Sequence, residues 1–326
     1  MKAIVYEKYG PPDVLQLREV EKPTPREDEV LVKVHAASVN YVDWQVLTGE
    51  SLLLRVLNGL LKPKHKILGD DVAGRIEAVG TNVKQFQPGD EVFGISDSDG
   101  FAEYSCVNSE YLGLKPANIS FEEAAAVPYT ASTALLGLRA NGQIQPGQKV
   151  LINGASGGVG TFAVQIAKSF GAEVTGVCST NKVDLVRSIG ADHVVDYTQE
   201  DFTKGEQRYD LIFDVAAYRS IFDYRRALAP EGIYICAGGS MSGFFQAMLL
   251  GPLISMSGSK KLGSLGWVKP GQEDFAVLSE LLEKGKIVAV IDKRFPLREV
   301  PEALRYYGAG HARGKIVITV IPEDKT

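Results

Sequence analysis

The sequence predicts an α/β protein of about two domains, one of them containing a doubly wound parallel sheet. From about residue 149, apolar runs typical of strands alternate with helical segments. Such alternation indicates βαβ units and a parallel sheet with helices on both faces. Residues 1–120 differ, because they read as strands punctuated by turn residues. A chain of 326 residues is long enough for about two domains.

The first 120 residues predict a β-rich domain. The expected strands cover 1–7, 30–34, 71–79 and 91–94, and a further strand begins at 101. A helix is expected over 121–127, because Ser120 suits an N-cap and two Glu residues fall in the first turn. The tail, 315–321, reads as a strand that returns to this domain.

The second half predicts the parallel sheet. Its expected strands are 149–153, 173–178, 193–196, 210–215, 232–237 and, as the last, 287–291. The expected helices run from the glycine cluster to 170, over 182–189 and over 275–283.

Composition disfavours several classes of protein. The net charge is −5 and no run of five Lys or Arg occurs, which disfavours binding to nucleic acid. Cys106, Cys178 and Cys236 are far apart, so neither a disulfide framework nor a closed structural zinc site is expected. The N-terminus lacks the apolar core of a signal peptide, and the apolar stretches 51–61 and 244–256 are too short to span a membrane. These observations predict a cytoplasmic protein.

A glycine cluster follows the strand 149–153 and opens a helix. Gly154, Gly157 and Gly160 give the spacing G-x-x-G-x-x-G, a variant of the dinucleotide-binding pattern. Glycine permits a tight turn and lets the backbone approach a pyrophosphate. The candidate binding residues are Ser156, Gly157, Gly158 and Val159. The alternative is a tight turn that binds nothing.

The end of the next strand favours NADP(H) over NAD(H). NAD-binding sites place an acidic residue there, whereas this chain has Ser179, Thr180 and Lys182. These side chains suit a 2′-phosphate, and Tyr197 lies after the third strand, where it could cover that group. The alternative is an ordinary N-cap at Ser179, Thr180 or Asn181 with a solvated Lys182, and it is compatible with phosphate binding.

Seven segments, the glycine cluster among them, carry a resemblance to a known family. They are 1–4, 37–43, 69–74, 88–92, 154–160, 190–194 and 314–317. In their order and spacing the chain resembles the medium-chain dehydrogenases/reductases, in the zinc-independent quinone oxidoreductase (zeta-crystallin-like) branch. The resemblance implies a GroES-like domain of residues 1–123 and 292–326. It also implies a Rossmann domain of residues 124–291 with strand order 3-2-1-4-5-6, and a homodimer.

The same resemblance implies roles for individual residues. Asn40 and Thr130 match positions that line the nicotinamide, and Asp43 matches a structural partner of Asn40. The remaining matches are Gly157, Gly158 and Val159 for the pyrophosphate, Ser179, Lys182 and Tyr197 for the 2′-phosphate, and Gly238, Gly239 and Lys315 beside the cofactor. For Gly238 and Gly239 a strand-end turn is an equal alternative, and for Lys315 a solvated strand lysine.

No metal site is expected. Asn40 and Asp70 stand where zinc-dependent relatives carry Cys and His. The Asp70–Asp71 pair is expected to be solvated or to cap a helix rather than to bind a hard cation.

The expected activity is NADPH-dependent hydride transfer to a quinone or an activated C=C bond. A conjugated oxygen spreads the developing charge without a Lewis acid, and Asn40, Tyr41 or Tyr129 would donate to it. A zinc-free alcohol dehydrogenase or carbonyl reductase and a non-catalytic NADPH-binding protein remain alternatives. The apolar segments 51–66 and 241–258 are expected to pack in a core or a dimer, with a mobile substrate cover or a membrane contact as alternatives.

Overall fold

The computed structural model folds into two compact units, which are described separately. The first unit contains residues 1–130 and 270–326, and the second contains 131–269. The structure describes residues 1–50, 52–96, 98–256, 258–266, 270–310 and 312–321, and the side chains of these except 52–54. The sequence analysis placed the boundaries at 123 and 291 instead.

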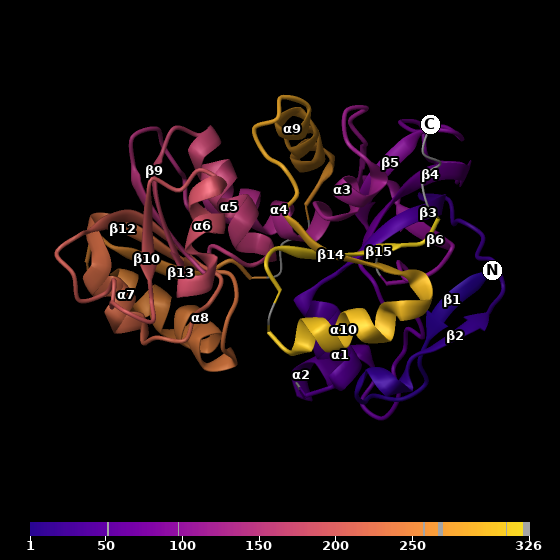
Figure 1. Ribbon diagram of the computed structural model, residues 1–326, viewed down its shortest axis with the longest axis horizontal. Coiled ribbons are helices and arrows are strands. Elements are labelled where there is room, and N and C mark those ends of the chain that lie inside the picture. The colour runs from indigo at the N-terminus through magenta and orange to yellow at the C-terminus, as the bar shows by residue number, and fades with distance from the viewer. Residues whose placement is uncertain (51, 97, 257, 267–269, 311, 322–326) are drawn as a thin grey trace. The chain divides into compact units, whose positions relative to one another are not determined.

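The second unit is built on a six-stranded parallel sheet (Figure 1). The strand order is β10-β9-β8-β11-β12-β13, and all five pairings are parallel. Numbered along the chain, this order is 3-2-1-4-5-6, so the predicted doubly wound topology is confirmed. The strands are β8 (Lys149–Asn153), β9 (Glu173–Cys178), β10 (His193–Asp196), β11 (Tyr209–Asp214), β12 (Leu228–Cys236) and β13 (Lys261–Ser264).

The prediction of the sixth strand was wrong. The sheet ends with β13, whose sequence Lys-Leu-Gly-Ser lacks the apolar run that signals a buried strand. Residues 287–290 form no strand, and β14 (Ile291–Pro296) pairs with β15 (Lys315–Thr319) in the first unit. The helix α9 (Gln272–Glu283) was predicted as a helix, but it packs on a strand of the first unit. Helical periodicity shows that one face is buried and does not identify the sheet that buries it.

Helices flank the sheet of the second unit. They are α4 (Pro128–Leu135), which begins in the first unit and continues as a π-helix to Asn141, α5 (Gly158–Ser169), α6 (Val183–Ser188), α7 (Ile221–Ala227) and α8 (Met241–Met256). Helix α5 contacts β8 and β9, whereas α7 contacts β12 and α8 contacts β12 and β13. Tyr224 and Tyr234 stack at 4.6 Å between ring centroids within the apolar core.

The first unit contains a seven-stranded sheet and a separate hairpin. The sheet order is β14-β15-β3-β4-β5-β7, with β6 paired to β3. Its remaining strands are β3 (Glu29–Val39), β4 (Asp71–Val79), β5 (Glu91–Ile95), β6 (Tyr104–Asn108) and β7 (Leu112–Leu114), and the hairpin consists of β1 (Lys2–Val5) and β2 (Gln16–Glu19). Because β15 pairs antiparallel with β3, the predicted return of the tail is confirmed.

Strand β3 contributes to two apolar clusters. Val30, Val32 and Val34 belong to one cluster, whereas Ala37 and Val39 belong to the other. The pairing of β3 with β4 shifts register between Val34 and Ala36. Since side chains alternate along a strand, such a shift changes which residues face each cluster. Ser38 near the end of the strand and Asn40 directly after it are both buried.

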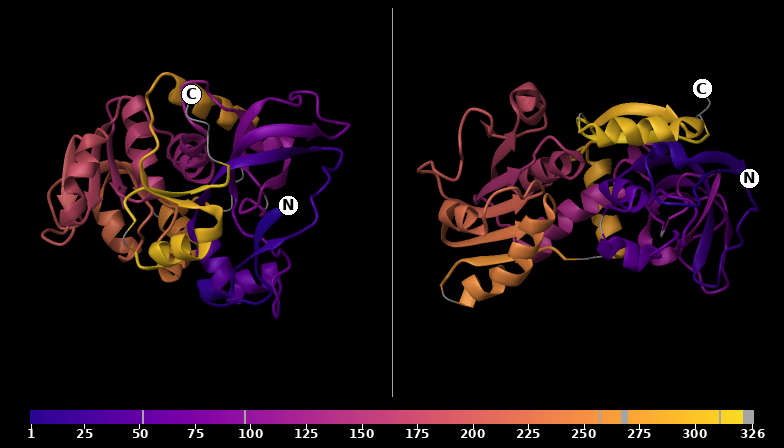
Figure 2. Two further views of the ribbon diagram at one scale, coloured as in Figure 1. Left: turned by 45° about the vertical axis from the view of Figure 1, so that its right-hand side comes forward. Right: turned by 90° about the horizontal axis from the view of Figure 1, so that it is seen from below.

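Four more helices complete the first unit. They are α1 (Tyr41–Thr48), α2 (Leu52–Asn58), α3 (Phe121–Ala125) and α10 (Val300–Gly308). The predicted start of α3 is confirmed, because the Ser120 side chain accepts a hydrogen bond from Glu123 N. Helix α10 runs beside β14 and β15 (Figure 2).

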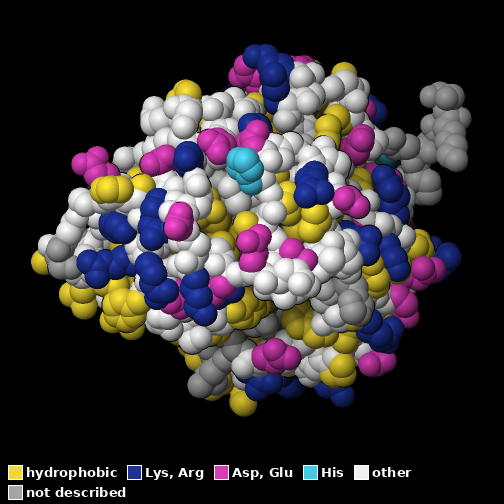
Figure 3. All heavy atoms as spheres, turned by 60° about the vertical axis from the view of Figure 1, so that its left-hand side comes forward, with side chains coloured by type: hydrophobic (Ala, Val, Ile, Leu, Met, Phe, Trp, Pro, Cys, Tyr) yellow, Lys and Arg dark blue, Asp and Glu magenta, His cyan; other side chains and the backbone are white. Residues whose placement is uncertain are grey.

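Helix α8 is apolar but largely exposed. Its buried residues are Gly243, Ala247 and Gly251, whereas Leu249, Leu253 and Met256 are 61%, 63% and 85% exposed. One face of this helix packs in the core through Ala247, with Phe244 and Ile254 beside it, whereas the opposite face is exposed. Hydrophobic side chains also reach the surface beside Lys and Arg in the space-filling view (Figure 3). Among the described residues, no helix is long and apolar enough to cross a bilayer.

Candidate active site

Asn40 is held at the junction of β3 and α1. Its side chain is 2% exposed, and its backbone N–H donates to Asp43 Oδ2 at 2.7 Å. The other oxygen, Asp43 Oδ1, accepts from Gly69 N at 3.0 Å. Asp43 thus joins the start of α1 to the segment before β4, as expected for a structural partner of Asn40.

The Asn40 amide is bonded at both of its polar atoms. Asn40 Nδ2 donates to Asp71 Oδ2 at 2.9 Å, and Asn40 Oδ1 accepts from Lys315 Nζ at 2.5 Å. Lys315 Nζ also contacts Asp71 Oδ2 at 3.1 Å. Three strands, β3, β4 and β15, therefore contribute to one buried polar cluster.

Asp71 is the centre of this cluster and is fully buried. Asp71 Oδ2 also accepts from Ser38 Oγ at 2.7 Å, and Asp71 Oδ1 accepts from Tyr129 N in the first turn of α4 at 2.8 Å. The sequence analysis expected a solvated or capping carboxylate. For Asp71 the capping role is confirmed by its bond from Tyr129 N, and the solvated role is wrong because the carboxylate is buried. The sequence near residue 71 could not show this, since nothing there indicates the lysine that arrives from position 315.

Lys315 is buried rather than solvated, and a place beside the cofactor stays a prediction. It is 2% exposed, and its ammonium has three acceptors: Asn40 Oδ1, Asp71 Oδ2 and Val39 O at 3.2 Å. An ammonium carries three protons, so these contacts use its donors within the protein. The expectation of a solvated strand lysine was wrong, and the geometry favours a role beneath Asn40.

The other candidates of the first unit differ in burial. Tyr41 is 52% exposed on α1. Burial, together with the charges of Asp70 and Asp71, raises the pKa of the Tyr129 hydroxyl to about 12, so it remains a donor at neutral pH. Thr130 is buried, and its hydroxyl donates to Ala126 O at 3.1 Å.

The glycine cluster of the second unit forms a turn between β8 and α5. Gly154 has φ +84°, and a Cβ on Gly160 would lie 2.1 Å from Gly154 O, so local geometry requires both glycines. Gly157 differs, because its φ is −86° and a Cβ there would meet nothing closer than Gly154 O at 3.6 Å. No contact within this turn requires glycine at 157. A ligand bound directly against the turn would require glycine at 157, because a Cβ would take its space.

The start of α5 supplies what an anion needs. The N–H groups of the first turn of a helix have no acceptor within the helix. Here that turn contains Gly158 and Val159, directly after the half-buried Gly157. A dinucleotide pyrophosphate fits this arrangement, since the positive end of the helix faces the turn. Ser156 is buried in the same turn, at 7% exposed.

The predicted 2′-phosphate residues gather at the ends of β9 and β10. Tyr197 N donates to Cys178 O at 3.0 Å, which places Tyr197 beside the segment that begins with Ser179. Lys182 is half-buried at the start of α6, and Tyr197 is 54% exposed. The Thr180 hydroxyl donates to Asp196 Oδ2 at 2.5 Å, so its proton is already engaged.

A buried network beneath the glycine turn was missed by the sequence analysis. Asn153 Nδ2 donates to Asp214 Oδ1 at 2.8 Å, and Tyr234 OH donates to Asp214 Oδ2 at 3.0 Å. Ala216 N also donates to Asp214 Oδ1. The network fixes the loop after β11 against the turn after β8. The available signal was a polar residue at the end of two otherwise apolar strands.

Gly238 and Gly239 lie in the turn after β12. Gly239 has φ +109°, and a Cβ there would lie 2.1 Å from Ala217 N, so packing requires this glycine. Gly238 O accepts from Ala217 N at 3.1 Å. A place beside the cofactor stays a prediction for both glycines.

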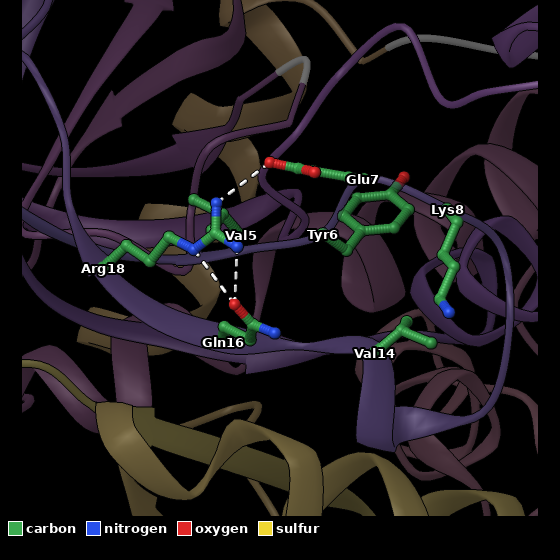
Figure 4. A pocket seen from close by; sticks show the side chains of 7 residues that line it. All are labelled: Val5, Tyr6, Glu7, Lys8, Val14, Gln16 and Arg18. Carbon is green, nitrogen blue, oxygen red and sulfur yellow. Dashed lines mark hydrogen bonds and ion pairs between the residues drawn. The ribbon is translucent and has the colours of Figure 1, made fainter.

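A pocket of about 330 Å³ lies beside the hairpin of β1 and β2 (Figure 4). Its lining residues are Val5, Tyr6, Glu7, Lys8, Val14, Gln16 and Arg18, none of which is a predicted site residue. Arg18 donates to Glu7 and Gln16 across the pocket. Among the described residues, no group of three or more His, Cys, Asp or Glu side chains is arranged to hold a metal ion.

Asp43 predicts how stability depends on pH. Burial raises the pKa of its carboxyl to about 7, and the hydrogen bond from Asn40 N offsets this only in part. The unfolded chain has a pKa near 3.9 for Asp, so the folded state binds the proton more tightly. This contribution to stability is complete below about pH 4 and is lost as the pH rises to about 7.

We expect the stability advantage of the natural protein over Asp43→Asn to be larger at about pH 5 than at about pH 8. Urea unfolding of both proteins at the two pH values measures this difference. An equal advantage at both values would contradict the assignment of the titration to Asp43.

Comparison with known proteins gives a consistent result. The family model for the alcohol dehydrogenase GroES-like domain matches residues 26–137, and the model for zinc-binding dehydrogenase matches residues 189–318. A 2-methylene-furan-3-one reductase of Solanum lycopersicum is 35% identical over 336 residues, covering 99% of this chain and 80% of the relative. A chloroplastic NADPH-dependent alkenal/one oxidoreductase of Arabidopsis thaliana is 33% identical over 337 residues, with the same coverage.

A solved structure agrees with these relatives. The quinone oxidoreductase of Escherichia coli complexed with NADPH superposes with a TM-score of 0.83 at 25% identity, covering 98% of this chain and 100% of that one. The chain therefore belongs to the medium-chain dehydrogenase/reductase superfamily, in its quinone oxidoreductase-like branch.

Proposed function

We propose that this chain is an NADPH-dependent reductase that transfers hydride to a quinone or to the C=C bond of an enone or enal. The observation that carries the proposal is the turn at Gly157, which is open where a pyrophosphate would lie and is followed directly by the start of α5. The names of the relatives, a furanone reductase, an alkenal/one oxidoreductase and a quinone oxidoreductase, support the class of substrate.

The cofactor-binding residues follow from the turn. Ser156, Gly157, Gly158 and Val159 would hold the pyrophosphate through backbone N–H groups. Lys182 and Ser179 would bind the 2′-phosphate, since β9 itself ends without the acidic residue of NAD-binding sites, and the neighbouring Asp196 carboxylate accepts from the Thr180 hydroxyl. Tyr197 is exposed next to them and would cover the adenosine end. Asn40 and Thr130 would lie toward the nicotinamide.

The residues of the first unit provide orientation and hydrogen bonds. Bound NADPH supplies the hydride. One hydrogen of Asn40 Nδ2 is bonded to Asp71, and the second remains to be directed toward a substrate oxygen. Tyr129 stays protonated at neutral pH, so it is the second candidate donor. Tyr41 is exposed and can exchange protons with solvent.

Zinc independence, oligomeric state and location are part of the proposal. Asn40 and Asp70 replace the Cys and His of zinc-dependent relatives, so we propose hydride transfer without zinc. We propose a homodimer through the exposed apolar face of α8, which packs beside the edge strand β13. A cytoplasmic location remains our proposal from the sequence, although some relatives are named as chloroplastic.

Substitution of Gly157 by Ala tests the cofactor site. The variant should bind NADPH roughly tenfold more weakly, because the new methyl group occupies the place of the pyrophosphate. Its stability should not fall, since Gly157 has a φ that alanine adopts and space for a Cβ. NADPH fluorescence titration and urea unfolding measure the two effects. Gly160→Ala is the matched control and should lose stability instead, through its contact with Gly154 O.

Turnover with panels of quinones, enones and alcohols tests the reaction. We expect oxidation of NADPH with members of the first two panels and a strong preference over NADH. Lys182→Ala should lower that preference about tenfold or more, because it removes the cation for the 2′-phosphate. Lys149→Ala is the matched control, as Lys149 is exposed at the amino end of β8, away from the carboxyl ends where ligands bind.

The other outcomes identify the alternatives. NADPH binding without turnover on any panel would support a non-catalytic NADPH-binding protein. Turnover confined to the alcohol and ketone couple would support a zinc-free alcohol dehydrogenase.

A further inference from the structure

We propose that Asp71, with Lys315 as its counter-ion, is the positioning residue that orients the Asn40 amide and the start of α4 for hydride transfer. The inference rests on the proposed function, and it assigns a role to a buried pair that need not touch the cofactor.

The two ends of the Asn40 amide have partners of opposite character. A carboxylate only accepts hydrogen bonds and an ammonium only donates them. With Asp71 on Nδ2 and Lys315 on Oδ1, only one of the two flip states of the amide is satisfied. Because the amide is planar, the direction of its remaining N–H is then fixed as well.

The two oxygens of the Asp71 carboxylate bind different elements of the first unit. Asp71 Oδ2 binds Ser38, Asn40 and Lys315, whereas Asp71 Oδ1 binds Tyr129 N. A single rigid group therefore links the end of β3 to the first turn of α4. That turn carries Tyr129 and Thr130, two of the other candidate site residues.

Burial of Asp71 and Lys315 costs free energy, because both charged groups lose contact with water. Asp71 is 0% exposed and Lys315 is 2% exposed, so both charges have lost their hydration. A buried ion pair is a poor source of stability, because an apolar pair of similar volume often does as well or better. We infer that the pair serves orientation.

The same unit contains a peripheral ion pair that serves as a control. Lys115 Nζ lies 3.1 Å from Glu91 Oε2, the same separation as Lys315 Nζ and Asp71 Oδ2. The Lys115 side chain is 5% exposed, but that of Glu91 is 33% exposed. Neither residue contacts Asn40 or α4 in any hydrogen bond described above.

The experiment uses five variants of the full chain. They are Asp71→Asn, Lys315→Met, the double variant D71N/K315M, the exchange variant N40D/D71N, and Lys115→Met as the control. Stability is followed by urea unfolding, NADPH affinity by fluorescence, and turnover as kcat and KM on the best substrate of the panels. The Asn40 side-chain NH₂ signal is followed by NMR and assigned by its loss in N40D/D71N.

The single variants D71N and K315M should lose roughly 10- to 100-fold in kcat. NADPH affinity should change by less than about threefold, because the pyrophosphate turn lies in the other unit. Each single variant should also lose stability, since a buried partner is left behind.

The double and exchange variants separate orientation from structure. The double variant removes both charges, and the exchange variant keeps one carboxylate and one amide beside Lys315. Both should recover stability relative to the single variants. In the double variant kcat should stay low because the Asn40 amide is no longer oriented, and in the exchange variant because position 40 no longer carries an amide. The natural protein should show slow hydrogen exchange at the Asn40 NH₂ group, and D71N should lose this protection. Lys115→Met should retain kcat.

Three results would overturn the inference. The first is a kcat that recovers together with stability in the double or exchange variant, because the pair would then be purely structural. The second is an unchanged kcat in D71N. The third is an Asn40 NH₂ group that exchanges freely in the natural protein. This last measurement does not need turnover, so it tests the orientation even if no substrate panel gives activity and the proposed function fails.

Discussion

The first unit depends on the Asp71 carboxylate, which is buried and therefore is not hydrated by solvent. Asp71 lies inside the seven-stranded sheet, and its hydrogen bonds come from β3, α4 and β15 as well as from Asn40. A buried carboxylate is costly unless donors surround it, and here four groups donate to its two oxygens. The requirement to satisfy this one group fixes the end of β3, the first turn of α4 and the position of the last strand.

The second unit also contains a buried carboxyl group, and the groups that donate to it are neutral. Asp214 is fully buried at the end of β11, and burial raises the pKa of its carboxyl. Its donors are an amide, a tyrosine hydroxyl and a backbone N–H, with no ammonium among the bonds described. In each unit one aspartate, Asp71 at the start of β4 or Asp214 at the end of β11, fixes the segment that carries a candidate site. In the second unit that segment is the glycine turn.

Local sequence signals predicted most of the fold. The parallel sheet and the start of α3 at Ser120 follow from periodicity, glycine spacing and capping, which are local properties of the chain, whereas the strand order was implied by the resemblance to the family. The sixth strand failed for the same reason, because Lys261–Ser264 is held by its pairing with β12 and has no apolar run of its own. The placement of α9 was wrong because its amphipathic pattern does not indicate which sheet the helix packs on. Packing far along the chain decides such cases.

The site was predictable where a single segment determines it. The glycine turn and the cluster at the end of β9 each lie on one or two neighbouring segments, so local patterns were enough to predict residues there, whose roles stay predictions. The environment of Lys315 was not predictable, because Asp71 is 244 residues away from it in the sequence. A lysine at the start of a strand reads as solvated until the fold brings a carboxylate against it. Asn153 and Asp214, 61 residues apart, were missed on the same ground.

The pairing of β15 with β3 also bears on how the protein is made. The first unit is discontinuous, since its N-terminal part ends at Thr130 and its last strand begins at Lys315. During synthesis, the second unit leaves the ribosome before that strand exists, and domains generally fold as they emerge. Until the final segment arrives, Asp71 has no cation and β3 has an open edge where β15 belongs. The N-terminal region of the nascent chain therefore stays incompletely folded after the nucleotide-binding unit has been synthesised in full. During this time it exposes a free strand edge of the kind that chaperones recognise.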